Sequence, residues 1–560
     1  MSSTASTPPQ IARRHDLDAL RAIAMLLGIV LHAALSFFPS LWPVQDSQQS
    51  GFFAVLVNML HGFRMPIFFM MSGFFTAMLW RKRGLKSLLW HRFVRIFVPF
   101  VLFVVTIIPL TNVVIGMAMS QGWADRPIDT TAMKHARSGD LWQAIRAGDH
   151  EALQEELEAG ADLARLHPET GMTPVNLAVL LGDGEAVAMM LDAGADINAR
   201  NRDGSTPLHS AAFLGRPKVA ELLLARGAAT NLTNNYGQTP AQVLNVDWGT
   251  TQFIAQLVEI EVDQETVMNG RRAIAEMLST TIDPSGGEGD IAQPSAGQGG
   301  LEALYFILFQ MPVFHHLWFL YFLCWLLVGF TFYALIANAV GWRGLPQWLM
   351  LSPWCYVWVI ALTMVPQWFM YEPAFGPDTS AGLLPMPHVL LYYAIFFGVG
   401  ALYFDTDDPS GRLGRGYWVT LPVALLVLYP LWYAITHRHL PLGWLDLGMV
   451  ELLLDFLQAG YAWLMTFGLL GLFRDWLSTE RPVMRYISDS SYWLYIVHLP
   501  LVIVLQMWVA DWPLPAWLKF ALIVLAAAAV LLLTYRYLVR YTVIGWLLNG
   551  RRKPPAKSPV

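Results

Sequence analysis

Ten stretches of mostly apolar residues constrain this sequence more than any other feature. Each is long enough to cross a membrane, and they run over 17–38, 52–80, 93–118, 301–337, 349–366, 388–404, 417–436, 450–473, 490–510 and 516–540. A helix needs about 20 apolar residues to span the bilayer. The composition agrees, because 55% of the residues are hydrophobic and only 14% are charged. We therefore expect an all-α fold, a polytopic membrane bundle of about ten transmembrane helices.

Basic residues fall on alternate ends and loops between these stretches, and this pattern predicts the orientation. The opposite loops contain only Arg438. Positively charged loops stay in the cytoplasm, so we expect both termini to be cytoplasmic, in a cell (inner) membrane. The basic set comprises "RKRGLKSLLWHR" at 81–92, the tail "RRKPPAK" within 546–560, and Arg13, Arg14, Arg343, Arg412, Arg415, Arg474, Arg481 and Arg485.

Net charge and cysteine content exclude other classes of protein. A formal net charge of −5 over 560 residues is close to neutral, so nothing indicates a nucleic-acid partner. Cys324 and Cys355 both lie in apolar stretches and are best explained as small core residues. Two such cysteines cannot build a disulfide framework or a metal site.

Residues 120–300 differ from the rest because they are soluble in composition and repetitive. Thr-Pro pairs begin at 173, 206 and 239, which is a period of 33 residues. The segment resembles ankyrin repeats, and His209 within "TPLH" fits a turn-stabilising role. We expect an ankyrin-repeat α-solenoid over 120–282 and a flexible linker over 283–300. Span parity places this insert outside the cytoplasm, where its surface could bind a protein partner.

Ionisable residues inside the apolar stretches indicate a functional site, because such residues are costly in lipid. Arg21 and His32 are eleven residues apart, which returns them to nearly the same helix face about 16 Å apart. Arg21, Arg92 and Arg95 are predicted near the cytoplasmic face, and His498 near mid-membrane. The residues predicted in the outer half are His61, Arg64, His316, Glu451 and Asp455.

This arrangement suits a transfer reaction across the bilayer. Arginines can hold the phosphates of a donor, a histidine can take a proton from an attacking hydroxyl, and outer carboxylates can bind sugar hydroxyls. Simpler explanations exist for some residues. Arg92 and Arg95 could be topological anchors, Glu451 and Asp455 a solvated helix end, and His498 a satisfied buried histidine. Anchoring explains Arg21 but leaves His32 unexplained.

Five motifs resemble the membrane acyltransferase-3 family. They are "LDALRAIAMLLGIVLH", whose Arg21 and His32 match the family's arginine and catalytic histidine, "FFMMSGFF" with Ser72, the pair Arg92-x-x-Arg95, "LWFLYFLCWL" and "SYWLYIVHLPL". The resemblance covers roughly 10–120 and 300–540. Within the family, "HGFRMPIFF" and "HLWFLYFL" look most like the branch of periplasmic glucan succinyltransferases. The resemblance implies acyl transfer, usually from acyl-CoA, to a hydroxyl of an extracytoplasmic carbohydrate.

The predicted membrane domain is split into 1–119 and 301–545 by the insert. The expected catalytic residues are His32, as general base or transient acyl carrier, with Arg21 and Asp18 to orient the donor or the helix. Acyl-CoA is expected as donor substrate, with no bound cofactor and no metal. Two alternatives stay open: a transporter or flippase, and a receptor or scaffold that acts through its ankyrin repeats. The expected substrate-binding residues are Arg92, Arg95, His61, Arg64, Ser72, Glu451, Asp455 and His498.

Overall fold

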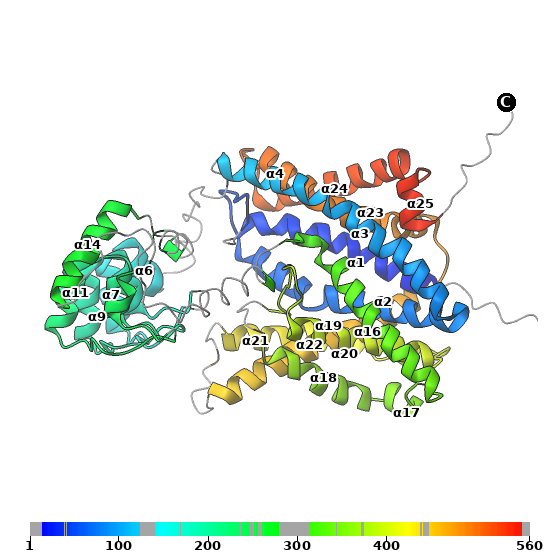
Figure 1. Cartoon of the computed structure of the whole chain (residues 1–560), viewed down its shortest axis with the longest axis horizontal. Coiled ribbons are helices and arrows are strands. Elements are labelled where there is room, and N and C mark those ends of the chain that lie inside the picture. The colour runs from blue at the N-terminus through cyan, green and yellow to red at the C-terminus, as the bar shows by residue number, and fades with distance from the viewer. Residues whose placement is uncertain are drawn as a thin grey trace, which may run out of the picture. The chain divides into compact units, whose positions relative to one another are not determined.

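The computed structural model divides the chain into two compact units, 1–129 with 304–560 and 130–303 (Figure 1). The linker predicted over 283–300 and the end of the tail beyond 550 lie outside the described residues. The structure describes residues 14–38, 40, 42–121, 123, 141–167, 170–235, 237–246, 248, 251, 254–255, 260, 262–278, 308–309, 313–342, 344–370, 375–436, 440 and 447–550.

The first unit is a bundle of apolar helices. Its short elements include the 3-10 turns η1 (Leu35–Phe37) and η4 (His315–Leu317) and the π-helical segments η2 (Phe93–Phe97), η5 (Ala424–Leu428) and η6 (Tyr535–Val539). No strand occurs among the residues that the structure describes in either unit. The α-helices are α1 (His15–Ala34), α2 (Gly51–Arg92), α3 (Val98–Val104), α4 (Ile107–Ser120), α16 (Trp318–Ala339), α17 (Gln347–Met350), α18 (Trp354–Gln367), α19 (Pro387–Asp405), α20 (Tyr417–Val423), α21 (Tyr429–Thr436), α22 (Leu447–Trp476), α23 (Pro482–Val509), α24 (Ala516–Thr534) and α25 (Val543–Asn549).

Eight helical stretches of the described chain are long and apolar enough to cross a membrane. The sequence predicted about ten, and two features explain the difference. One stretch, Gly51–Ser120, is 70 residues long and contains both the second and the third predicted spans. The fifth predicted span corresponds to α18, which has 14 residues and is shorter than a span usually needs. The chain is a multi-pass membrane protein.

One predicted boundary was wrong. The basic segment 81–92 was expected to be a loop, but α2 continues through it and is interrupted only at Gly84, whose φ of 76° is easily adopted only by glycine. Within the fourth predicted stretch, 301–337, the described α-helix starts at Trp318, after the η4 turn. Residues 301–307 and 310–312 lie outside the described residues.

Helix α1 is central to the bundle. Figure 1 shows it between α23 and α24 on one side and α2 and α22 on the other, and it contacts all four. Its first turn carries Asp16 and Asp18, which suit the positive end of the helix dipole. A residue on α1 can therefore meet side chains from both halves of the membrane unit.

Helices α2 and α19 cross at very close range. A Cβ added to Gly73 would lie 1.8 Å from the carbonyl oxygen of Phe397, and one added to Gly400 would lie 1.9 Å from that of Met70. The two glycines therefore let the two backbones touch. This crossing fixes the position of α2, which carries His61, Arg64 and Arg92.

The second unit consists of paired helices stacked at the predicted repeat. Thr173, Thr206 and Thr239 are the N-cap residues of α8, α10 and α12. His209 bonds the Thr206 hydroxyl through Nδ1 at 2.8 Å and the Gln238 carbonyl of the next repeat through Nε2 at 2.9 Å. It therefore has the expected turn-stabilising role. The described helices are α6 (Leu141–Ala147), α7 (His150–Glu158), α8 (Pro174–Leu181), α9 (Gly184–Asp192), α10 (Pro207–Phe213), α11 (Pro217–Ala225), α12 (Pro240–Val243) and α14 (Gln264–Met277).

Candidate active site

Helices α1 and α23 run side by side in the same direction, and each contributes to two clusters of polar residues. Arg21 donates from Nη2 to the Ser488 hydroxyl at 2.8 Å and to the Ser488 carbonyl at 3.3 Å. Further along both helices, the ring centroids of His32 and His498 lie 5.0 Å apart. The eleven-residue spacing on α1 therefore separates an arginine level from a histidine level by about 16 Å.

The histidine cluster consists of His32, His498 and His316. His316, in η4, lies 5.2 Å from His498 between ring centroids, with the rings nearly perpendicular. His316 and His498 are almost fully buried, at 7% and 3% exposure. Trp42 covers the other side of His32 at 5.7 Å. Three imidazoles from distant parts of the sequence thus share one site.

Backbone carbonyls determine which ring nitrogens of this cluster carry hydrogen. The Nε2 of His316 is bound to the Ile496 carbonyl at 2.9 Å, and the Nδ1 of His498 to the Tyr495 carbonyl at 2.8 Å. A carbonyl only accepts, so each of these nitrogens is the donor. The opposite nitrogen of each neutral ring then carries a lone pair. Both of these nitrogens, and Nδ1 of His32, are buried without a hydrogen-bond partner among the described residues.

Arg64 brings a cation to the histidine cluster. It interacts electrostatically with His32, His498 and His61, which lies one turn before it on α2. Its guanidinium packs against Gly28, because a Cβ added there would lie 2.6 Å from Nη1. Its buried Nε has no partner among the described residues. A free N–H donor beside a candidate base suits the stabilisation of a developing oxyanion.

The arginine cluster consists of Arg21, Arg92 and Arg95. Arg21 also pairs with Asp18 at 3.5 Å, and Arg92 interacts electrostatically with both of the other arginines. Guanidinium groups gathered in this way suit an anion such as phosphate.

The two arginines of the Arg92-x-x-Arg95 motif have different neighbours. Arg92 donates to the Thr76 hydroxyl at 3.0 Å, whereas the Arg95 guanidinium packs against Gly550. Arg92 is the last residue of α2, whereas Arg95 belongs to the π-helical segment η2. The two arginines therefore contact different parts of the membrane unit.

Three predicted site residues lie elsewhere. Ser72 is linked to the arginine cluster through its backbone, because its carbonyl accepts from the Thr76 hydroxyl at 2.7 Å. Glu451 is exposed and Asp455 half-buried on α22, where the two carboxylates interact with each other. The contacts of the described residues do not bring these carboxylates to His32 or His498.

Sequence reasoning missed two polar residues that support the site. Gln506 donates to the His32 carbonyl at 3.0 Å and accepts from Trp42 Nε1 at 2.8 Å. Lys519 forms a buried ion pair with Asp46 at 2.9 Å, which fixes the segment after α1 to the start of α24. Gln506 and Lys519 are polar residues within apolar stretches, and this signal could have revealed them.

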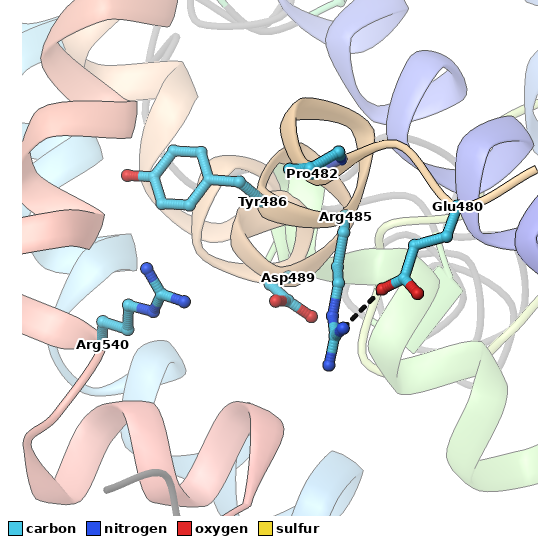
Figure 2. A pocket seen from close by; sticks show the side chains of 6 residues that line it. All are labelled: Glu480, Pro482, Arg485, Tyr486, Asp489 and Arg540. Atoms are coloured by element: carbon cyan, nitrogen blue, oxygen red, sulfur yellow. Dashed lines mark hydrogen bonds and ion pairs between the residues drawn. The ribbon is translucent and has the colours of Figure 1, made fainter. Parts of the chain in front are cut away.

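A cavity of about 360 Å³ opens at the beginning of α23. Figure 2 shows its lining, in which Arg485 pairs with Glu480 at 2.5 Å. Asp489 of the lining follows Ser488, the partner of Arg21. The lining is thus polar and carries positive and negative side chains. Its lining residues are Glu480, Pro482, Arg485, Tyr486, Asp489 and Arg540.

The described residues contain no group of three or more His, Cys, Asp or Glu arranged to hold a metal ion. The two clusters described above consist of imidazole and guanidinium groups. Such a site can accept a proton from a hydroxyl and stabilise negative charge, which is what transfer of an acyl group requires.

Comparison with known families decides the class of protein. The family model of the acyltransferase domain of the acyltransferase-3 family matches residues 14–126 and 272–536, more than half of the chain. The chain belongs to this family. As an acyltransferase-3 protein it is an enzyme, which decides against a transporter or a pure scaffold. A second family model, for three copies of the ankyrin repeat, matches residues 141–234. It confirms that the inserted segment contains ankyrin repeats.

Individual relatives match over shorter regions. Glucans biosynthesis protein C of Escherichia coli (strain K12 / DH10B) is 35% identical over 103 residues, which are 18% of this chain and 26% of the relative. The protein of the same name from Escherichia coli O1:K1 / APEC has the same identity and coverage. The match thus spans about a quarter of these relatives. The ankyrin repeat domain of Bcl-3 is 27% identical, covering 24% of this chain and 50% of that chain with a TM-score of 0.18.

Proposed function

We propose that this acyltransferase moves an acyl group of acetyl or succinyl type from acyl-CoA to a hydroxyl of an extracytoplasmic carbohydrate such as a glucan. The relatives that share a quarter of their length with it are named for the biosynthesis of glucans. In this proposal the enzyme lies in the inner membrane with both termini in the cytoplasm. The ankyrin repeats then lie outside the cytoplasm, where they bind a partner protein.

The two-level arrangement on α1 is the observation that carries the proposal. The arginine cluster suits phosphates at one level, and His32 suits proton or acyl transfer about 16 Å further along the helix. A donor with phosphates at one end, an acyl group at the other and a long flexible arm between them matches this separation. Acyl-CoA has that form.

The reaction requires only groups that the two clusters supply. The acceptor oxygen attacks the thioester carbonyl carbon while its proton passes to His32. Arg64 stabilises the oxyanion of the tetrahedral intermediate. The carbon–sulfur bond then breaks, and the leaving thiolate takes the proton back from His32. In the variant with an acyl carrier, a His32 nitrogen attacks the thioester carbonyl carbon, the carbon–sulfur bond breaks and the thiolate leaves. The acceptor hydroxyl then attacks the acyl carbon, the bond to the His32 nitrogen breaks, and the hydroxyl proton passes to the thiolate.

The test is transfer of radiolabelled acyl groups by the purified enzyme in liposomes, with acyl-CoA on one side and a glucan on the other. We expect the wild type to label the glucan and His32→Ala to lose at least about 100-fold in rate. The matched control is His388→Ala, which changes a histidine of α19 outside both clusters. Wild-type transfer by a folded His32→Ala variant would remove His32 from the mechanism. Label that crosses the membrane without joining the glucan would contradict acyl transfer to this acceptor.

A further inference from the structure

A catalytic histidine normally has a partner that sets its tautomer and direction, and His32 has no obvious one. In well-studied hydrolases a carboxylate accepts one ring N–H so that the other nitrogen faces the substrate. The Nδ1 of His32 has no hydrogen-bond partner among the described residues. The nearest charged side chain that acts on it is Arg64, which cannot accept a hydrogen bond.

His498 has the properties of the missing partner. Its Nδ1 is committed to the Tyr495 carbonyl, so the neutral ring presents the lone pair of Nε2. This nitrogen is buried and unpaired, and the ring centroid lies 5.0 Å from that of His32. A buried acceptor without a donor is costly, and a ring N–H of His32 would satisfy it.

His316 and Tyr495 hold His498 in this orientation. The Tyr495 hydroxyl donates to the His316 carbonyl at 2.5 Å, and the His316 ring donates to the Ile496 carbonyl at 2.9 Å. The His316 ring also packs against the His498 ring, with the two ring centroids 5.2 Å apart. These two hydrogen bonds join η4 to α23. The orientation of the His498 ring is therefore held by contacts from both elements.

We propose that His498 is the positioning residue for His32, a role that rests on the proposed function of His32. When the substrates are bound, Nε2 of His498 accepts the N–H of one His32 nitrogen, and the other nitrogen faces the acceptor hydroxyl. The hydrogen bond shortens only in the substrate complex, as catalytic hydrogen bonds often do. The pair neither gains nor loses a proton over the whole reaction, because His32 takes one proton from the acceptor hydroxyl and gives it to the leaving thiolate.

A neutral acceptor suits this site better than a carboxylate. A carboxylate beside Arg64 would form an ion pair with the guanidinium, and Arg64 would then be unable to stabilise an oxyanion. An imidazole lone pair orients His32 and leaves the cation free. This explains why two histidines, and not a histidine and an aspartate, meet next to Arg64.

The experiment compares His498→Leu, His498→Gln and His498→Ala in the acyl-transfer assay. Leucine cannot accept a hydrogen bond, so we expect kcat to fall about 100-fold with the KM for both substrates nearly unchanged. Glutamine can accept through Oε1, so we expect it to recover most of this loss. Imidazole added to His498→Ala is expected to restore activity in a saturable way.

The outcomes separate this inference from the proposed function. If His32→Ala is inactive while a folded His498→Leu variant has wild-type kcat, only the positioning role fails. If both are active, the role of His32 fails as well. If His498→Leu does not fold, the test uses His498→Gln and His498→Ala with added imidazole. An equal loss of kcat in these two variants overturns the inference. A change confined to KM would also contradict it, since a positioning residue acts on kcat.

Discussion

At the scale of single residues, Gly28 determines where the cation of the active site lies. It is four residues before His32 on α1, on the same face, and the Arg64 guanidinium occupies the space that a side chain would fill. Arg64 also interacts electrostatically with Tyr495 and Tyr393. Under the proposed function, the missing side chain at position 28 contributes to the chemistry without touching a substrate.

We predict that Gly28→Ala lowers kcat about 10- to 100-fold without preventing folding. The new Cβ would lie 2.6 Å from Arg64 Nη1, which is the end of a flexible side chain and can move. Arg64 would move away from His32 and stabilise the oxyanion less well. The rates are measured by acyl transfer and the folding by the thermal midpoint in detergent. Gly329→Ala on α16 is the control, because nothing lies within 4 Å of its added Cβ. Equal activity of both variants would contradict the prediction.

At the scale of helices, the crossing of α2 and α19 gives a structural reason for the glycine of "FFMMSGFF". We predict that Gly73→Ala destabilises the membrane unit by at least about 1–3 kcal/mol, because the new methyl group would meet the backbone oxygen of Phe397 at 1.8 Å. The measurement is the thermal midpoint and yield of the purified protein. Gly398→Ala on α19 should behave like the wild type, since its added Cβ meets nothing within 4 Å.

A pair of helices in the repeat unit should respond to pH. His150 of α7 bonds Asp183, the N-cap of α9, at 2.8 Å, and this hydrogen bond raises the pKa of His150. The pair therefore stabilises the unit below the ordinary histidine pKa, and the gain is lost as pH rises through the raised value. The contribution of this pair to the stability of the repeat unit is small, because the His150 side chain is about one third exposed.

We predict that the repeat unit 130–303 has a higher unfolding midpoint than its His150→Gln variant at about pH 5.5, and that the two converge near pH 8.5. Thermal unfolding followed by circular dichroism measures both. Changing His150 is preferable to changing Asp183, because Asp183 also caps α9 by accepting from the Ala186 N–H. A difference that is constant with pH would show that the pair acts by packing and not by charge.

At the scale of the whole molecule, the two units should be separable in function. All the members of both clusters lie in the unit formed by 1–129 and 304–560. We predict that replacing 130–303 by a short flexible loop keeps transfer to a small soluble acceptor within about twofold, since repeat stacks contact mainly their own neighbours. The same replacement combined with His32→Ala should be inactive. A correctly inserted but inactive loop variant would place the repeats in the active site.

The sequence predicted the helices better than it predicted which residues of different helices meet. The tenth apolar stretch, 516–540, corresponds to a helical stretch over Ala516–Val539, because continuous apolar residues in lipid leave the backbone few alternatives. The position of His32 and Arg21 on one helix likewise follows from spacing. That His316 meets His498, or that Arg64 fills the space at Gly28, depends on how distant helices pack, and no local pattern encodes it.

The pairing of α1 with α23 also has a consequence for biosynthesis. The first helix carries Arg21 and His32, but their partners Ser488 and His498 are translated more than 450 residues later. Until α23 has been made and inserted, neither level of the site is complete. Under the proposed function, a nascent or prematurely terminated chain that already contains the whole first-helix signature lacks both partners, and catalysis starts only when the helices have assembled.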